Sequence, residues 1–336
     1  MSANDRRAPA RHAYRTAAGC AALLAGMSHP AFAQAPGPFP SKPIRLIVPQ
    51  APGGQNDIQA RAVGRRLAEV LGQPVVVDNR PGAGGQLGFD VAAKAPPDGY
   101  TLALGSISTL AVIPAVQPKL GWHPLKDFAP ITLLSSSPYI VVVHPSVPAA
   151  TLQELIGLAR AKPDQLRYGS SGTATGLHLS TELFNVMAGV KMVHVPYKGI
   201  APATTAILGG EVQVLFNNVI PALPHVKTGR LRALAVTSAK RSAAAPDVPT
   251  VAEAGVPGYE SGSWQGIAAA GRPPQPVVDR LHRELVAILR SPEIADFLTS
   301  QGNEVGANTP ADFERFIARE IAKWTRVVRD AGIRVE

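Results

Sequence analysis

The stretch IRLIV-PQAPGGQN-DIQARAVGRRLAEVL, residues 44–71, contains three consecutive local patterns. Residues 44–48 are a short apolar run typical of a buried strand. Residues 49–54 hold two prolines and two glycines and predict a tight turn. From Asp57 to Leu71 apolar residues recur at near-helical spacing, and Gly72 ends the pattern as a C-terminal cap. A strand that leads through a turn into a helix is the building unit of an α/β fold.

The same alternation of short β-branched runs and helical patterns continues along the chain. It predicts further strands at 75–77, 100–104, 140–143, 166–169, 193–195, 212–216 and 231–236. It predicts helices around 87–95, 151–161, 177–188, 202–209, 221–228 and 276–290, and a last helix that begins at Pro310 after Thr309. We therefore expect parallel sheets with crossover helices.

The length of 336 residues predicts two domains at about 150 residues each. No repeat or long linker separates two halves, so we expect one lobe to be inserted into the other, with the chain crossing twice. Short runs of small residues near 135–138 and 237–239 mark the expected crossings. The predicted lobes are 36–137 plus 239–336 for the first and 138–238 for the second.

The N-terminus has the order of a secretory signal peptide. Four arginines within residues 1–15 precede an apolar stretch at 16–27, and Ala31-Phe32-Ala33 forms a small-x-small cleavage signature. Cleavage after Ala33 removes four arginines and one aspartate, which lowers the formal charge from +9 to +6. It also removes Cys20, the only cysteine, which excludes a disulfide scaffold and a thiolate metal site. We expect a periplasmic protein.

Several function classes lack their sequence signatures. The basic residues are spread along the chain without interleaved aromatics, so we expect no nucleic-acid partner. No nucleophile elbow occurs, no histidines of the mature chain have metal-ligand spacing, and the glycines of 82–88 miss the dinucleotide pattern by one displaced position. We expect no catalytic residue, no metal and no cofactor, and therefore not an enzyme.

Two polar, glycine-containing turns remain, each after a predicted strand and before a predicted helix. The first is 50–57 and the second is 170–176, which offers four hydroxyl groups. Glycines let the backbone turn tightly, and a helix N-terminus presents N–H groups and a positive dipole end, which suits a carboxylate. Ordinary helix capping by Asp57 and by Thr173 or Thr175 is the alternative for either turn taken alone.

Motifs in a fixed order also resemble a known family. They are PSKPI at 40–44, PQAPGG at 49–54 with Asp57, NRPGAGG at 79–85, PDGYTL at 97–102, HVPYKG at 194–199 and PDVPT at 246–250. This set is similar to the Bug-type substrate-binding proteins of tripartite tricarboxylate transporters. The resemblance implies a two-lobed periplasmic binding protein fold of type II, in which each lobe is a mostly parallel sheet flanked by helices. It further implies a cleft between the lobes that closes on a small organic acid, and delivery to the integral membrane permease subunits of a tripartite transporter. We expect a monomer.

The resemblance implies a set of ligand-binding residues in the two turns and at one further strand end. They are Gln50, Gly53, Gly54, Gln55, Asn56, Asp57, Ser170, Ser171, Thr173, Thr175 and Asn217. Asn217 stands where many relatives have Asp, which favours an acid without an amine. Tyr139 and Trp264 are further candidates for which core packing is the alternative, and Lys198 is one for which a solvated surface charge is the alternative.

Two alternatives come from other classes. The protein could be a ligand-responsive partner of a signalling receptor, which would present its closed lobes to that receptor. It could also be an exported enzyme acting on a carboxylic acid, with His178 or Asp57 as the base. The absence of a paired base and nucleophile argues against the enzyme.

Overall fold

The structure is a computed structural model that describes residues 39–117 and 119–333. The predicted signal peptide lies outside the described residues. None of the helices in these two ranges combines the length and the apolar composition that a membrane span requires.

Six strands form the first sheet, in the order β11-β4-β10-β3-β1-β2. Their bounds are Ile44–Val48 (β1), Val75–Asn79 (β2), Thr101–Ser106 (β3), Phe128–Ser137 (β4), Ser263–Ala270 (β10) and Glu304–Val305 (β11). Strand β1 pairs parallel with β2 and β3, while β10 is antiparallel to both β3 and β4, and β11 is antiparallel to β4. Four of the strands therefore run in one direction.

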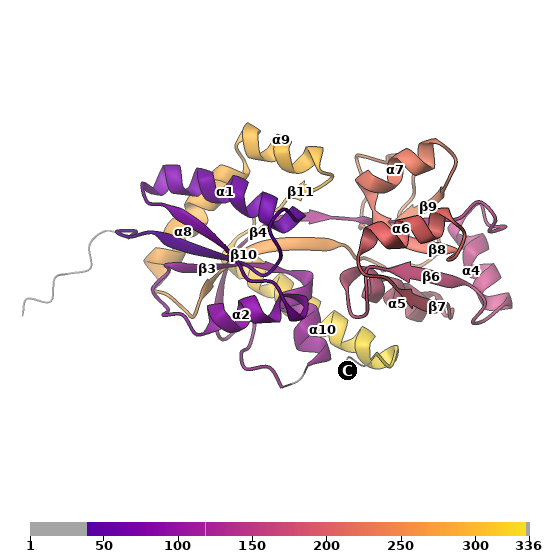
Figure 1. The fold of residues 1–336 in the computed structure, drawn as a ribbon, viewed down its shortest axis with the longest axis horizontal. Helices are drawn as coiled ribbons and strands as arrows, with labels where there is room; N and C mark the ends of the chain where they lie inside the picture. Colours follow the sequence, from indigo (N-terminus) through magenta and orange to yellow (C-terminus); the bar gives the residue numbers. More distant parts are fainter. Residues whose placement is uncertain (1–38, 118, 334–336) are drawn as a thin grey trace, which may run out of the picture. The chain divides into compact units, whose positions relative to one another are not determined.

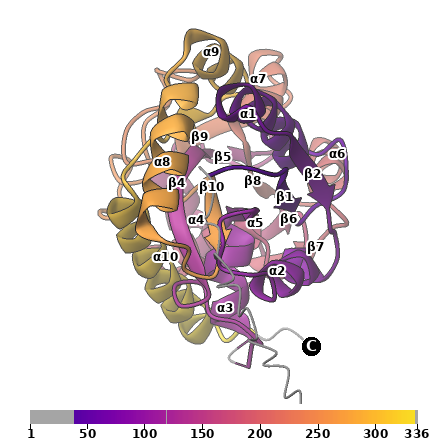
Figure 2. The ribbon, with the colours of Figure 1, turned by 90° about the vertical axis from the view of Figure 1, so that its left-hand side faces the viewer.

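Helices cover both faces of this sheet (Figures 1 and 2). One face packs on Gln55–Leu71 (α1), Gln275–Leu289 (α8) and Pro292–Ser300 (α9), and the other on Gln86–Ala93 (α2), Ile113–Val116 (α3) and Pro310–Asp330 (α10). A π-helical turn, Ser108–Val112, precedes α3. Successive side chains of β1 enter different cores, because Leu46 and Val48 face α1 while Ile47 faces α2.

Five strands form the second sheet, in the order β7-β6-β8-β5-β9. Their bounds are Tyr139–Val143 (β5), Arg167–Ser170 (β6), Val193–Pro196 (β7), Val214–Asn218 (β8) and Arg232–Val236 (β9). Four of these strands share one direction and β5 opposes them. The flanking helices are Leu152–Ala161 (α4) and Gly176–Ala188 (α5) on one face, and Ile200–Leu208 (α6) and Val219–Lys227 (α7) on the other. We call each sheet with its helices a lobe, the six-stranded one first.

The chain passes between the lobes at two places. Strand β4 continues into β5 through Pro138 alone, where the sequence predicted a crossing. The return comes later than Thr237 to Ala239, because residues 239–261 lie beside the second sheet. Val251 bonds back to Val236, and the Tyr259 ring packs edge-on against Phe184 of α5. The chain re-enters the first sheet at Ser263, so the lobe assignment of residues 239–261 is revised.

The crossings fix which strand ends face each other. Because β4 runs in the same direction as β1 and β3 and leads directly into β5, which opposes β6 and β8, the carboxyl ends of both sets point toward the crossing segments. Ligands of open α/β sheets bind at the carboxyl ends of the strands. The turns after β1 and β6 lie at those ends.

Candidate functional site

The first turn joins β1 to α1, and a buried carboxylate organises it. Asp57 is the third residue of α1 and only 3% exposed. Its carboxylate accepts hydrogen bonds from Arg61 Nε (3.0 Å), from the Gly53 N–H (2.9 Å) and from Asn79 Nδ2 (2.9 Å). The bond from Arg61, with those from Gly53 and Asn79, lowers the pKa of Asp57 to about 2 although burial opposes the shift. The negative charge of Asp57 is therefore compensated by donors within and beside the turn.

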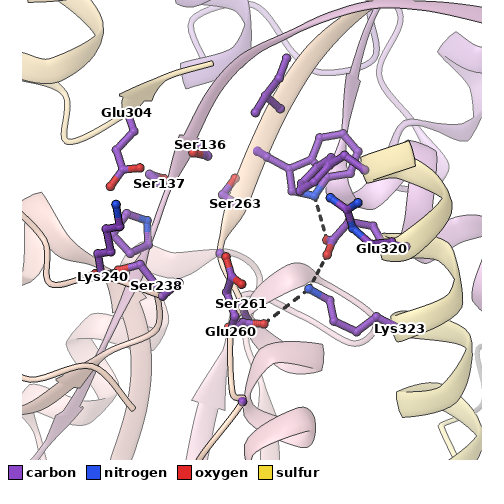
Figure 3. Close-up of a pocket in the computed structure, with 18 residues that line it drawn as sticks. Ser136, Ser137, Ser238, Lys240, Glu260, Ser261, Ser263, Glu304, Glu320 and Lys323 are labelled. Carbon is purple, nitrogen blue, oxygen red and sulfur yellow. Dashed lines mark hydrogen bonds and ion pairs between the residues drawn. The ribbon is translucent and has the colours of Figure 1, made fainter. Parts of the chain in front are cut away.

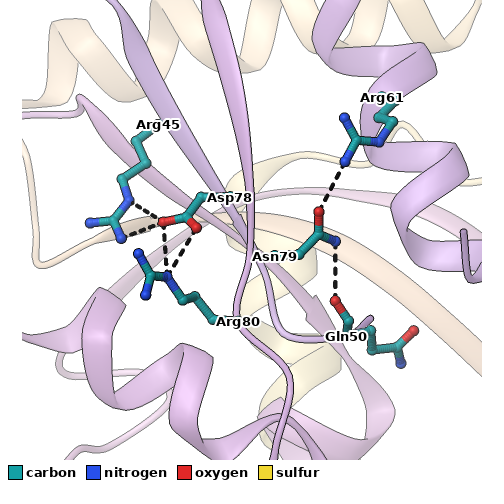
Figure 4. Close-up of polar contacts among 6 residues, drawn as sticks. All are labelled: Arg45, Gln50, Arg61, Asp78, Asn79 and Arg80. Carbon is teal, nitrogen blue, oxygen red and sulfur yellow. Dashed lines mark hydrogen bonds and ion pairs between the residues drawn. The ribbon is translucent and has the colours of Figure 1, made fainter. Parts of the chain in front are cut away.

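Asn79, at the end of β2, anchors the same turn from below. Its Nδ2 also donates to the Gln50 carbonyl oxygen (3.1 Å), and its Oδ1 accepts from Arg61 (2.9 Å) (Figure 4). On the opposite side of β2, Asp78 is held between Arg45 and Arg80. The Asn79 contacts attach the turn to the end of β2, and the Asp78 contacts join β2 to Arg45 of β1.

The groups of the first turn that remain free are backbone donors. The N–H groups of Gln55, Asn56 and Asp57 have no hydrogen-bond partner among the described residues, as expected for the first turn of a helix. Gly54 caps this helix in an extended conformation (φ −74°, ψ 163°) without a side chain. The side-chain amide group of Asn56 also has no hydrogen-bond partner among the described residues, although Asn56 is only 4% exposed. The side-chain amide group of Gln55 donates to Asn303 Oδ1 (3.3 Å).

The second turn joins β6 to α5 and uses most of its hydroxyl groups internally. Thr175 is the N-cap of α5: its Oγ1 accepts from the His178 N–H and donates to the Gly172 carbonyl oxygen (2.8 Å). Ser171 donates to Thr175 (3.1 Å), and Ser170 is fully buried beside His194. Thr173 is exposed, and its hydroxyl group has no partner among the described residues.

The free donors of the second turn are again backbone groups. The N–H groups of Gly176 and Leu177, the first two residues of α5, have no partner in the described part of the chain. Each predicted turn therefore presents the N-terminus of a helix of more than three turns, with neutral donors and no free charged side chain of its own.

The structure brings only part of the predicted site to these turns. Asn217 is fully buried and its amide group bonds to Thr204 of α6 (3.1 Å) and to the Asn218 N–H (2.8 Å), so it is used within the second lobe. Trp264 is buried and its indole N–H donates to Glu320 of α10 (2.9 Å). This position corresponds to core packing, the alternative that the sequence left open for Trp264. Lys198 is exposed, two residues before α6, and Gln50 is exposed in the first turn.

Tyr139 and Ile107 lie where the lobes approach each other beside the second turn. A Cβ atom at Gly176 would meet the Tyr139 hydroxyl group at 2.8 Å and the Ile107 side chain at 3.5 Å. Ile107 follows β3 of the first lobe, so the start of α5 touches both lobes. Sequence reasoning missed Ile107 and the anchoring role of Asn79, although Asn79 could have been noticed as the first polar amide after a predicted strand.

A hollow of about 660 Å³ lies elsewhere, at the crossing segments (Figure 3). Its wall contains five serines, Ser136, Ser137, Ser238, Ser261 and Ser263, together with charged residues of α10. Lys323 of α10 contacts Glu320 and donates to the Glu260 carbonyl oxygen (3.4 Å), which ties α10 to the return crossing. Trp264 is the one residue of the predicted site in this wall. Within the described ranges, no group of three or more His, Asp, Glu or Cys residues could hold a metal ion.

Comparisons with known proteins agree with this architecture. The model of the tripartite tricarboxylate transporter family receptor matches residues 59–333. Protein BugT of Bordetella pertussis is 37% identical over 299 residues, covering 89% of this chain and 92% of BugT.

Two solved structures are similar to this chain over almost their whole length. An R. palustris protein solved with adipate is 38% identical, with a TM-score of 0.75 over 88% of this chain and 99% of that chain. MatC of Rhodopseudomonas palustris, solved with bound malate, is 32% identical, with a TM-score of 0.72 over 86% of this chain and 100% of its own. The resemblance drawn from the sequence motifs and the predicted two-lobed α/β fold are both confirmed. The chain belongs to the tripartite tricarboxylate transporter receptor family, among the Bug-type solute-binding proteins.

Proposed function

We propose that this protein is a periplasmic receptor that captures a small organic acid between its two turns and delivers it to the integral membrane permease subunits of a tripartite transporter. Family membership supports the receptor role. Two relatives that were solved with adipate and with bound malate support a carboxylic acid as the ligand class. The predicted cleavage after Ala33 supports export, and N-terminal sequencing of the exported chain tests it by an expected start at Gln34.

The observation on which the proposal rests is the pair of helix N-termini with free N–H groups. Helix α1 offers Gln55, Asn56 and Asp57, and α5 offers Gly176 and Leu177. Such N–H groups bind anions because the peptide dipoles of the helix sum to a partial positive charge at this end. Asp57 does not oppose an anion here with a free charge, because Arg61 and two further donors already compensate it.

Binding by neutral donors from both lobes also explains how capture of the acid would favour the closed arrangement of the lobes. A carboxylate that contacts α1 and α5 together gains free energy only when the lobes hold both N-termini near it. Differential contact of this kind shifts the population toward the closed arrangement. Hinge closure around a ligand in periplasmic binding proteins is a general example of such a shift. The permease subunits would then bind the closed lobes.

A panel of acids tests the ligand class. Melting curves are recorded with adipate, malate, other mono-, di- and tricarboxylates and aromatic acids, and with the neutral diamide of adipate as the matched control. An acid at 100 times its Kd stabilises the protein by about 2.7 kcal/mol, which is a measurable shift. Shifts with acids and none with the diamide are expected. No shift with any acid, or turnover of a bound acid, contradicts the proposal.

A pair of variants at one position tests the backbone donors. Gln55→Pro removes the first N–H of α1 but keeps the helix, because proline suits the first helical position and Gly54 already has the extended conformation that a following proline requires. Gln55→Ala removes the side chain and keeps the N–H. A hydrogen bond to a charged group contributes about 1.5–3 kcal/mol, so the Pro variant should bind the acid found in the panel at least tenfold more weakly. Equal affinities of the two variants would contradict the proposed site.

A further inference from the structure

Three stacked aromatic rings lie directly behind the second turn. The His178 and His194 rings are 3.9 Å apart at 13°. The Tyr168 ring is nearly parallel to both, 5.0 Å from the His194 ring and 6.3 Å from the His178 ring. Tyr168 is fully buried and its hydroxyl group bonds to Glu182. The three ring-bearing residues come from α5, β7 and β6, so the stack joins the two elements that the turn connects, β6 and α5, to the neighbouring strand β7.

Each histidine of this stack bonds to one end of the turn. His194 Nε2 lies 2.6 Å from Ser170 Oγ, at the end of β6. His178 Nδ1 accepts the N–H of Ala174 (3.0 Å), just before the N-cap of α5. Ala174 has φ +57°, a left-handed conformation that alanine rarely adopts. A residue held there needs compensating contacts, and the bond to His178 is one.

We propose that His178 is a positioning residue of the binding site: its neutral ring, fixed by the stack on His194, holds Ala174 in the left-handed conformation and so aims the first N–H groups of α5. The effect on acid binding rests on the proposed function, whereas the effect on the conformation of Ala174 does not. His178 does not touch the acid. It acts through the backbone of the turn that does.

The surroundings of His178 require the neutral form. The titratable groups that face it are His194 on β7 and Tyr168 on β6. The carboxyl group of Glu182, one turn further along α5, bonds to the Tyr168 hydroxyl group. Burial, and secondly the neighbouring His194, lower the pKa of His178 to about 3, and burial lowers that of His194 to about 4. Protonation of Nδ1 in addition to Nε2 would turn the acceptor of the Ala174 N–H into a second donor. It would also place a positive charge beside the His194 ring.

Two variants separate the acceptor from the ring. His178→Phe keeps a ring that can stack on His194 but has no acceptor, and His178→Asn loses the ring but keeps an oxygen near the position of Nδ1. Amide hydrogen exchange of Ala174 is measured without any acid, and melting curves establish that both variants are folded. Loss of one hydrogen bond, about 1 kcal/mol, corresponds to roughly fivefold faster exchange at Ala174 in the Phe variant. The Asn variant should stay close to the wild-type rate.

The ring nitrogens provide an independent readout in the wild-type protein. Two-bond ¹H–¹⁵N spectra at pH 6 should show His178 with an unprotonated Nδ1 and a proton on Nε2. Either a protonated Nδ1, or exchange at Ala174 that is unchanged in the Phe variant or equally faster in both variants, overturns the inference.

Titrations with adipate and malate connect the inference to binding. The Phe variant should bind whichever of these acids the wild type binds about fivefold more weakly, and the Asn variant should bind it nearly as well as the wild type. Equal affinity of the Phe variant would overturn the role in binding. If the wild type binds no acid at all, the proposed function fails, while the exchange rates and ring spectra still decide whether His178 holds the turn.

Discussion

Replacing Asp57 by Asn tests whether this carboxylate holds the first turn. Three donors point at it, from Arg61, Gly53 and Asn79. An Asn side chain offers one oxygen, so its NH₂ group must face at least one of these donors. A pKa lowered from 3.8 to about 2 corresponds to about 2.5 kcal/mol in favour of the charged form. Solvent screens part of this because the Arg61 side chain is 52% exposed, so we expect a loss of about 1–2 kcal/mol.

Urea unfolding at pH 7 and at pH 3 measures this loss. The contribution of Asp57 is fully present above pH 3.8 and disappears as the pH falls toward 2, because its folded-state pKa is the lower one. The difference between wild type and variant should therefore shrink at pH 3. The matched control is Asp312→Asn, at the third position of α10, where the carboxylate is exposed and a much smaller effect is expected. Equal unfolding free energies of wild type and Asp57→Asn at pH 7 would refute the assigned role.

Three further substitutions test other parts of the structure. Gly266→Ala should destabilise the first lobe by about 1–3 kcal/mol, because a Cβ there would lie 2.2 Å from the Phe313 ring and 2.9 Å from the Thr132 carbonyl oxygen; an unchanged melting temperature would contradict this packing. Trp264→Phe should cost about 1–2 kcal/mol in urea unfolding, since the buried Glu320 carboxylate then loses one of its two indole donors; full stability would argue against this contact. His178→Phe should flatten the pH dependence of stability: the ring pKa is lowered in the folded protein, so its contribution is complete above pH 6.5 and is lost as the pH falls toward 3, at about 1.4 kcal/mol per pH unit. Parallel wild-type and variant curves between pH 6 and 4 would refute it.

The strand, turn and helix units could be predicted because their signals are local. The apolar run of β1, the cap at Gly72 and the N-cap at Thr309 each act within a few residues, and the structure confirms them. Strands β4 and β10 could not be predicted in this way. β10 reads SWQGIAAA, and its strand conformation comes from pairing with β3 on one side and β4 on the other. The late return crossing likewise depends on tertiary contacts of Val251 and Tyr259 with the second lobe.

The position of both turns could be predicted, but the roles of their side chains could not. Asp57 and Thr175 each follow a glycine-containing turn, and the sequence allowed either capping or ligand contact for both. The structure shows both engaged within their turns, because the Arg61 side chain donates to the Asp57 carboxylate and the Thr175 hydroxyl group accepts the backbone N–H of His178. Asn217 lies near the end of its strand, as the sequence predicted. Its side chain, however, is on the face of the sheet that points to Thr204, because alternate residues of a strand face opposite sides.

Hydrogen exchange measured while the acid with the largest melting shift is added tests whether two helix N-termini hold the acid. We expect slower exchange of the amides of Gln55, Asn56 and Asp57 in the first lobe, and of Gly176 and Leu177 in the second, in the same titration and with the same Kd. Protection confined to the hollow at the crossing segments, or to one turn alone, would contradict it.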